Sequence, residues 1–431
     1  MSKKLTIAIV LAAILGGFAV MFFRGEKQCV TINPVANNIG VKAYQIQMKS
    51  NNVLYMKCRF KNAGVLHNSS TKHGLSVIVG DLLCRKINGL SPEETTDKLR
   101  ELGVEKLSIL TVEDDFIISF YVLKDKTDAA LQFLSPIFSR PEFSTNDLEF
   151  IKEKYPSLLE LETARPQELL WDKLLSMLYQ NHNYGRNNTG TAQAVAGITA
   201  EDVREFIKTH FLKNTLEFFV TGDVACTEIA TYAETLFGKL AERHSVESSD
   251  KANDLSSSPM SEEKDATIFK KNMGNVVGVI IGVRIDNLSE KERAAAHIII
   301  ETLFDSKIGD FLLGLRAKNI AYDVNYHFLR RNFSNVFYFL VYIDKNDLKN
   351  YKEYMEDKMS AYQKELNLKD FRRTQNLLVM QSKIGFADMA EIDKRIEYNS
   401  LLFAEVTQAV LNDTARKLFN KSYRRVVYIG S

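Results

Sequence analysis

Cysteine is scarce and net charge is almost absent in this sequence of 431 residues. The cysteines are Cys29, Cys58, Cys84 and Cys226, and no two of them form a CxxC pair. Without that spacing the sequence indicates neither a zinc knuckle nor a disulfide framework, although individual bridges stay open. The 56 basic and 54 acidic residues leave a net charge of +2. No overall field therefore draws the chain to nucleic acid, and we expect no nucleic-acid partner.

Catalytic and metal-binding motifs are also missing. We find no GxSxG elbow and no P-loop, which argues against a hydrolase with an active site of another type. No two histidines are separated by three or four residues, the spacing that places two imidazoles on one helix face. The histidines are His67, His73, His182, His210, His244, His297 and His327. We therefore expect no bound metal and no cofactor.

A long apolar run lies near the start of the chain. Leu5–Phe23 carries no charge and follows Lys3 and Lys4. Its length of about 19 residues is close to the roughly 20 that cross a bilayer as a helix. Because no A-x-A-like cleavage site follows, we interpret residues 1–28 as an uncleaved signal anchor with its lysines in the cytoplasm. The alternatives are a cleaved signal peptide and a buried core helix, and the terminal position argues against the second. We expect the body of the protein to be exported.

A polar segment divides the body into two domains of ordinary size. Residues 244–267 are rich in Ser, Asp, Glu and Lys and show no periodic apolar face, which is typical of a solvated linker. The linker separates a domain at 29–243 from a second domain at 268–431.

The two halves repeat one order of elements. In each half an apolar helical stretch leads to a Leu-Arg pair, then to an alternating strand and an amphipathic helix. The corresponding segments are Leu75–Leu83, Leu99-Arg100 and Phe116–Leu123 in the first half, and Ala294–Phe304, Leu315-Arg316 and Val336–Ile343 in the second. We predict an α+β fold of two homologous α/β domains, each with an antiparallel sheet backed by helices.

Shorter signals predict individual elements of the first domain. Thr199 precedes two acidic residues and an amphipathic run to His210, which predicts a capped helix. Leu216–Val224 carries strand signals, and Cys226–Leu240 predicts a helix that closes the first domain.

One stretch of about forty residues resembles a known family. Asn183–Val224 reads NYGRNNTGTAQAVAGITAEDVREFIKTHFLKNTLEFFVTGDV and is similar to a segment of pitrilysin/insulinase-type zinc metallopeptidases, including mitochondrial-processing-peptidase-like proteins. The shared residues are Tyr184, Gly185, Arg186, Gly190, Thr191, Ile198, Thr199, Asp202, Phe206, Asn214, Gly222, Asp223 and Val224. The resemblance extends over nearly the whole body, from about Leu54 onward, and implies that the two domains form half of a clam-shell chamber.

The family's zinc motif, HxxEH, is absent from the matching position. In that motif two histidines hold Zn²⁺ and the glutamate takes a proton from the bound water. Aligned on Gly74-Leu75, this chain has Val77 and Asp81 in place of the histidines and Gly80 in place of the glutamate. The third family ligand aligns loosely with Glu160, which we interpret as a solvated helix residue. We likewise interpret His73, a lone histidine beside the turn, as a structural residue and not as a zinc ligand.

A second family pattern is retained in part. Active members carry a sequence like LREKxGLAYSV, whose arginine and tyrosine contact the peptide near the zinc; this chain has LRAKNIAYDV, Leu315–Val324. The resemblance implies substrate-binding roles for Arg316 and Tyr322, through carbonyl recognition and oxyanion stabilisation. The spacing is one residue shorter, and Ile320 stands where glycine is usual. The alternative is that Arg316 pairs with a surface acid while Tyr322 packs on the sheet.

The resemblance therefore implies a zinc-free subunit of a peptidase complex rather than a peptidase by itself. It would form a heterodimer with an HxxEH-containing homologue and bind a peptide substrate. The N-terminal helix would attach it to the membrane. In a Gram-negative source the body would lie on the periplasmic side of the inner membrane. Two other functions stay open: an organising subunit without substrate contact, and a hydrolase with an unrecognised site.

Overall fold

The computed structural model describes residues 32–48, 52–69, 71–242, 255, 258–305, 309–364, 366, 368–383 and 400–431. The predicted signal anchor, residues 1–28, lies outside these residues and stays a prediction. Among the helices of the described residues, none combines the length and apolar character needed to cross a bilayer.

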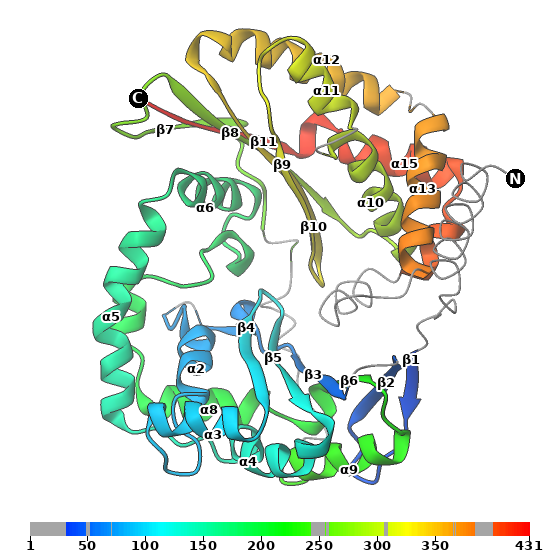
Figure 1. Cartoon of the computed structure of the whole chain (residues 1–431). Helices are drawn as coiled ribbons and strands as arrows, with labels where there is room; N and C mark the ends of the chain where they lie inside the picture. The colour runs from blue at the N-terminus through cyan, green and yellow to red at the C-terminus, as the bar shows by residue number, and fades with distance from the viewer. Residues whose placement is uncertain are drawn as a thin grey trace, which may run out of the picture.

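A six-stranded sheet forms the centre of the first domain (Figure 1). Its strands are β1 (Ile32–Val35), β2 (Lys42–Gln47), β3 (Val53–Lys61), β4 (Val104–Thr111), β5 (Asp115–Leu123) and β6 (Leu216–Gly222), in the order β1-β2-β6-β3-β5-β4. β3 pairs antiparallel with both β5 and β6, so it lies near the middle of the sheet. Every residue of β6 is buried, including the polar Glu217 and Thr221.

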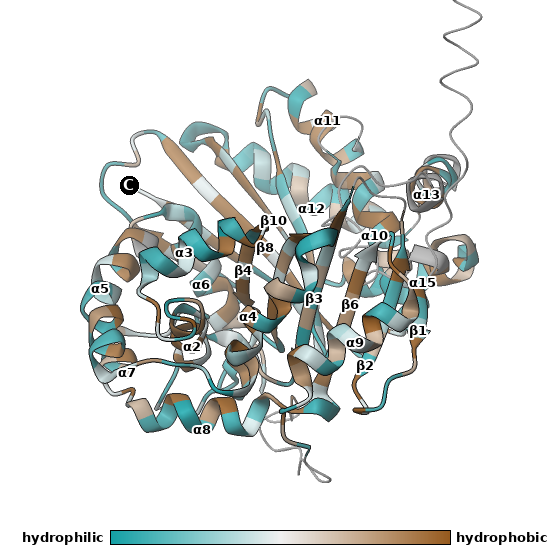
Figure 2. Cartoon of the chain, turned by 60° about the horizontal axis from the view of Figure 1, so that its bottom comes forward, coloured by the Kyte–Doolittle hydropathy of each residue, from teal (hydrophilic) through white to brown (hydrophobic). Residues whose placement is uncertain are grey.

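Helices pack around this sheet and complete its core. They are α2 (Leu75–Leu83), α3 (Pro92–Glu101), α4 (Thr127–Ser139), α5 (Thr145–Thr163), α6 (Pro166–Leu178), α7 (Ala192–Ala196), α8 (Ala200–His210) and α9 (Cys226–Phe237). Two 3₁₀ turns matter for the site, η1 (Val65–His67) and η3 (Asn183–Gly185). Figure 2 shows brown hydrophobic residues along β6, whereas teal hydrophilic residues interrupt the surface helix α8.

The second domain repeats the topology of the first. Its strands are β7 (Asp265–Phe269), β8 (Val276–Asp286), β9 (Asn325–Arg330), β10 (Ser334–Asp344) and β11 (Arg424–Gly430), in the order β7-β11-β8-β10-β9. Its helices include α10 (Glu290–Phe304), α11 (Asp310–Ala317), α12 (Leu348–Lys364), α13 (Leu368–Lys383) and α15 (Gln408–Leu418). Replacing β2, β6, β3, β5 and β4 by β7, β11, β8, β10 and β9 converts one strand order into the other, with β1 as an addition. The predicted pair of similar α/β domains is confirmed at this level.

The prediction of purely antiparallel sheets is wrong in one place in each domain. β2 pairs parallel with β6, and β7 pairs parallel with β11. In both domains the two strands are separated in sequence by most of the domain, including its helices, and a long connection of that kind permits parallel pairing. The prediction rested on runs of strands next to long helical stretches, and that order of elements does not fix the direction of every strand.

The predicted start of the helix at Thr199 is confirmed. Thr199 Oγ1 accepts a hydrogen bond from the Asp202 amide, and the Asp202 carboxylate accepts one from the Thr199 amide. This reciprocal capping box satisfies donors that the first helical turn leaves without partners. The predicted strand and closing helix correspond to β6 and α9, which end at Gly222 and Phe237.

α6 belongs to the first domain in sequence but packs against the second sheet (Figure 1). Ile280 of β8 joins the apolar cluster formed with α6, whereas Val279 and Ile281 face the core under α10. Two glycines lie on the α6 side of β8 and allow the helix to approach closely: a Cβ on Gly282 would lie 2.6 Å from Leu174 Cδ2. The domains therefore share an apolar interface.

The end of the predicted linker is packed rather than solvated. Residues 243–254 and 256–257 lie outside the described residues, but Ser258 and Ser261 are buried. Arg284 Nη1 donates to the Ser258 carbonyl, and Arg425 Nε donates to the Ser261 carbonyl. The composition alone suggested that these backbone carbonyls would face water, but the two arginines satisfy them in the interior. The last residues of the predicted linker, from Asp265 onward, already belong to β7.

Candidate functional site

The position of the family's zinc motif lies on α2 and carries no ligand set. α2 begins after Gly74, and Val77 and Asp81 lie four residues apart on one face of the helix. Val77 is half-buried and Asp81 is exposed, with partial desolvation raising the pKa of its carboxyl group. Within the described part of the chain, no three His, Cys, Asp or Glu side chains are grouped so that they could hold a metal ion.

Gly80, at the glutamate position, faces β4. A Cβ at Gly80 would lie 3.1 Å from Ile109 Cγ2 and 3.8 Å from Thr111 Oγ1. Thr111 Oγ1 itself donates to the Ser76 carbonyl on α2. The space that a catalytic glutamate would need is thus filled by the packing of α2 on the sheet.

His73 anchors the loop that resembles the family motif. Its side chain is buried, and Nε2 lies 2.6 Å from the Asn187 carbonyl, which makes Nε2 the donor of this hydrogen bond. Burial lowers the pKa of His73, and the charge of nearby Arg186 lowers it further. The hydrogen bond to the Asn187 carbonyl acts in the opposite direction and raises the pKa. His73 is therefore a neutral structural contact between the start of α2 and the loop before α7.

The same contact explains Gly190 of the matching segment and Gly74 at the start of α2. Gly74 has φ +94° and Gly190 has φ +83°. A Cβ on Gly74 would lie 2.5 Å from the Thr189 carbonyl oxygen, and one on Gly190 would lie 2.4 Å from the His73 carbonyl oxygen. Only glycine combines this backbone conformation with so close an approach.

Glu160, which aligns loosely with the third zinc ligand, lies on α5. Its side chain is exposed, and α5 packs beside α2. The structure therefore brings the helix of Glu160 next to the degenerate motif without forming a metal site among the described residues.

Arg316 and Tyr322 lie in the second domain, at the end of α11 and in the loop that follows. Arg316 Nε donates to the Tyr322 carbonyl at 3.0 Å, while the Tyr322 side chain is 74% exposed. The Tyr322 side chain therefore does not pack on the sheet as the alternative interpretation expected. Figure 1 places α11 and α2 in different domains, so the two sets of site residues are not brought together within this chain.

The departure at Ile320 has a clear physical basis. The preceding Asn319 adopts φ +55°, a left-handed conformation that asparagine tolerates better than other non-glycine residues. Ile320 is buried in the core of the second domain, and its amide donates to the Leu315 carbonyl. The shortened loop thus closes α11 with Asn319 and turns Tyr322 outward.

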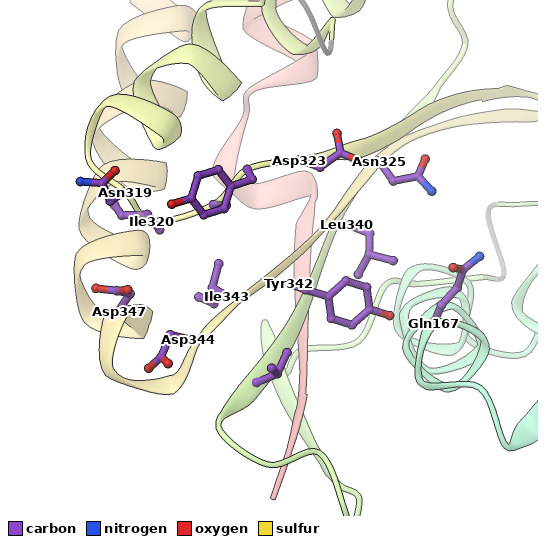
Figure 3. Close-up of a pocket in the computed structure, with 13 residues that line it drawn as sticks. Gln167, Asn319, Ile320, Asp323, Asn325, Leu340, Tyr342, Ile343, Asp344 and Asp347 are labelled. Carbon is purple, nitrogen blue, oxygen red and sulfur yellow. The ribbon is translucent and has the colours of Figure 1, made fainter.

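Tyr322 lies at a pocket of about 570 Å³ between α6 and the second sheet. In Figure 3, Gln167 of α6 lies opposite Tyr342 of β10, with Asn319 and Asp347 on the far side. The lining residues are Gln167, Val276, Asn319, Ile320, Ala321, Tyr322, Asp323, Asn325, Leu340, Tyr342, Ile343, Asp344 and Asp347. Gln167 and Tyr342 were not predicted, because no local pattern relates residues so far apart in the sequence.

Comparison with known proteins agrees with the geometry. The sequence profile described as "Peptidase M16 inactive domain" matches residues 197–378. A protein of Rickettsia felis named "Uncharacterized zinc protease" is 22% identical over 216 residues, 50% of this chain and 51% of the relative. The probable mitochondrial-processing peptidase subunit beta of Arabidopsis thaliana is 24% identical over 182 residues, 42% of this chain and 34% of the relative.

The chain is thus similar to the pitrilysin-type, or M16, peptidase family, whose profile covers residues 197–378. The matched stretch spans about half of the first relative's length and about a third of the second's. At the level of fold, the chain is similar to the crystal structure titled "peptidase M16 inactive domain" from Pseudomonas fluorescens, with a TM-score of 0.81, 17% identity and coverage of 93% of this chain and 98% of that one. The chain lacks the HxxEH motif at the position where that family places it.

Proposed function

We propose that this chain is a zinc-free subunit that supplies Arg316 and Tyr322 to the chamber of an HxxEH-containing homologue. The observation that carries the proposal is the contrast between its two sites. α2 has valine, glycine and aspartate where a zinc site needs two histidines and a glutamate, whereas Tyr322 stands exposed at the edge of a pocket. Similarity to a probable mitochondrial-processing peptidase subunit beta supports assembly with a homologous partner.

The two side chains suit complementary tasks toward a peptide. The Arg316 guanidinium has five N–H donors, and the Nε–H is the one used on the Tyr322 carbonyl. That bond fixes the backbone from which Tyr322 projects, while the terminal nitrogens suit peptide carbonyl oxygens. The tyrosine hydroxyl would donate to the oxygen on which negative charge develops at the partner's zinc.

Membrane attachment and export are part of the same proposal. The uncharged run Leu5–Phe23 after Lys3 and Lys4 supports an anchor whose body faces the periplasm of a bacterial cell. The mature protein should fractionate with membranes and retain its N-terminus. N-terminal sequencing of a soluble form that starts near Gly25 would favour a cleaved signal peptide.

An organising role without substrate contact is the second candidate. It is favoured by the Arg316–Tyr322 bond itself, because an arginine that closes its own loop has a structural use. In that case the complex would need this chain for assembly but not for peptide turnover.

The decisive experiment compares site variants within the assembled complex. Affinity capture of the full chain from solubilised membranes, followed by mass spectrometry, should recover an HxxEH homologue. With that complex, Arg316→Ala and Tyr322→Phe should each leave assembly intact and lower hydrolysis of a fluorogenic peptide by about a hundredfold, the lower end for loss of one preorganised donor.

Matched controls remove an arginine and a tyrosine hydroxyl at exposed positions outside the pocket. Arg416→Ala removes an exposed arginine, and Tyr423→Phe removes the hydroxyl of a partly exposed tyrosine outside the pocket. Both should retain full activity. If the two site variants also assemble and turn over peptide normally, the organising role replaces the substrate-holding role.

A further inference from the structure

Two equivalent hairpins meet tip to tip at the boundary between the domains. The turn between β4 and β5 corresponds in topology to the turn between β9 and β10. Arg331 Nη2 donates to Glu113 Oε1 at 2.7 Å, and the Asn332 amide donates to Asp114 Oδ2 at 3.0 Å. The Arg331 side chain is only 1% exposed, so this contact is an interior one.

A third segment, between α6 and α7, fills the space between the tips. Tyr184 Oη donates to Asp114 Oδ1 at 2.5 Å. The Arg331 guanidinium lies 4.6 Å from the centre of the Tyr184 ring and 5.3 Å from that of Tyr179. The contacts of Arg331 and Asn332 cross between the domains and require them to be docked, whereas the Tyr184–Asp114 bond lies within the first domain.

Asp114 differs from the two carboxylates beside it. Glu113 is paired with Arg331, and Asp115 is paired with Arg59 at 2.5 Å. The contacts of the Asp114 carboxylate are instead the neutral donors of Tyr184 and Asn332, and the residue is 6% exposed. Burial raises the pKa of Asp114 to about 6; the two hydrogen bonds oppose this rise, and the charges of Asp115 and Glu113 add to it.

We propose that this junction is a proton-sensitive latch, in which protonation of Asp114 tightens the docking of the two domains and ionisation loosens it. The charged groups around the latch are Glu113 and Asp115 on its own hairpin and Arg331 on the facing one, with the Tyr184 hydroxyl from the third segment. Neither hairpin tip coincides with Arg316 or Tyr322, so the latch does not depend on the proposed function.

The direction follows from linkage between docking and proton binding. When the tips separate, Asp114 meets water and its pKa returns toward the ordinary value of 3.8. Because the docked state binds the proton more tightly, the added stability is full below about pH 4 and lost as the pH rises through about 6. With these two values the docking equilibrium should weaken about tenfold between about pH 5 and about pH 7.5.

The latch also bears on the pocket at Tyr322. Gln167 of α6 and Tyr342 of β10 line that pocket from different domains. A change in docking at the hairpin tips would alter the spacing between these two walls, so the pocket would take its most closed form at mildly acidic pH.

Tryptophan fluorescence can report the docking directly. Trp171 is the only tryptophan of the chain. It lies on α6 with its ring centre 4.5 Å from that of Tyr338 on β10, across the domain interface. Urea titrations of the full chain, followed by this signal at about pH 5 and about pH 7.5, give the docking equilibrium at each pH.

The comparison is between wild type and Asp114→Asn, which keeps the shape and removes the charge. Histidines whose pKa is lowered by burial, such as His67 and His297, act in the opposite direction in the same pH range and are common to both proteins. The docking constant of the wild type, divided by that of Asp114→Asn, should therefore fall about tenfold from about pH 5 to about pH 7.5. Asp97→Asn, at an exposed carboxylate on α3, should follow the wild type.

A ratio that stays constant between the two pH values would overturn the latch. Should Asp114→Asn fail to fold, Tyr184→Phe decides the question. Loss of the hydroxyl donor disfavours the ionised carboxylate, so the pH midpoint of the Trp171 response should move upward. A midpoint that is unchanged or lower would also overturn the proposal.

Discussion

At the scale of single residues, the loop before α7 depends on the absence of one side chain. Gly190 has φ +83°, and a Cβ there would lie 2.4 Å from the His73 carbonyl oxygen. Gly40 has a similar φ of +74° but no atom within 4 Å of the corresponding position. The pair separates the effect of backbone conformation from the effect of close approach.

Gly190→Ala should therefore destabilise the protein more than Gly40→Ala. The left-handed conformation costs about 1 kcal/mol in either variant. The clash at Gly190 adds about 1 to 3 kcal/mol, because the loop must move away from α2. Chemical denaturation of both variants measures the difference; equal unfolding free energies would contradict the close contact.

Rebuilding the family motif on α2 should not restore a zinc site. In Val77→His/Gly80→Glu/Asp81→His, the Cβ of the new glutamate lies only 3.1 Å from Ile109 Cγ2 on β4, so Ile109 must shift to admit it. Ligands without supporting contacts also bind metal weakly. We expect no stoichiometric zinc by elemental analysis and a loss of about 1 to 3 kcal/mol in unfolding free energy.

The matched control is the double variant Val77→His/Asp81→His, which leaves Gly80 intact. It should retain nearly the stability of the wild type, since position 77 is half-buried and position 81 is exposed. One zinc per chain in the triple variant, with unchanged stability, would show that α2 still accommodates the catalytic arrangement.

At the scale of elements, α6 joins the domains by resting on glycine positions of β8. Gly282 lies under Leu174, with only 2.6 Å between a built Cβ and Leu174 Cδ2. Leu174 is fully buried. A small residue on the strand and a large one on the helix are therefore complementary across the interface.

A double-mutant cycle tests this complementarity. Gly282→Ala overpacks the contact and should cost about 1 to 3 kcal/mol, while Leu174→Ala leaves a cavity and should cost about 2 to 5 kcal/mol. The double variant should be more stable, by about 1 kcal/mol or more, than the sum of the two single-variant losses predicts. The reason is that the methyl group of Ala at position 282 occupies part of the cavity left by Leu174→Ala.

The control cycle pairs Gly282→Ala with Leu170→Ala. Leu170 is equally buried on α6 but is not among the close neighbours of Gly282. These two effects should add within about 0.5 kcal/mol. Additivity in both cycles would mean that α6 does not pack on β8 as described.

At the scale of the whole molecule, half-buried histidines predict acid sensitivity. Burial lowers the pKa of His67 to about 4, with His210 adding to the shift, and burial lowers that of His297 to about 4, with Arg330 adding. A histidine held neutral in the folded state stabilises the protein fully above about pH 6.5, and this stability is lost as the pH falls toward 4.

His297→Gln should flatten this part of the pH profile. Removing the titrating ring should reduce the loss of unfolding free energy between about pH 6.5 and about pH 4 by at most about 3 kcal/mol. Global unfolding followed by circular dichroism across that range measures the slope. The difference from wild type at about pH 7.5 gives the baseline cost of the substitution, and a slope identical to that of the wild type would contradict the assignment.

Several features of this protein follow from its sequence alone. Periodicity and capping residues determine helices such as α8, because the Thr199–Asp202 box acts within four residues. The repeated order of elements determines the two-domain topology, and the side chains at Val77, Gly80 and Asp81 determine the absence of the HxxEH ligands.

Other features were decided only by the tertiary structure. The parallel pairs β2–β6 and β7–β11, the packing of α6 across the boundary and the meeting of Asp114 with Asn332 all join residues far apart in the chain. The pocket likewise brings Gln167 beside Tyr342. Local patterns report which face of an element is apolar, but they do not report which distant surface covers it; that choice depends on the packing of the whole chain, where steric fit and burial act together.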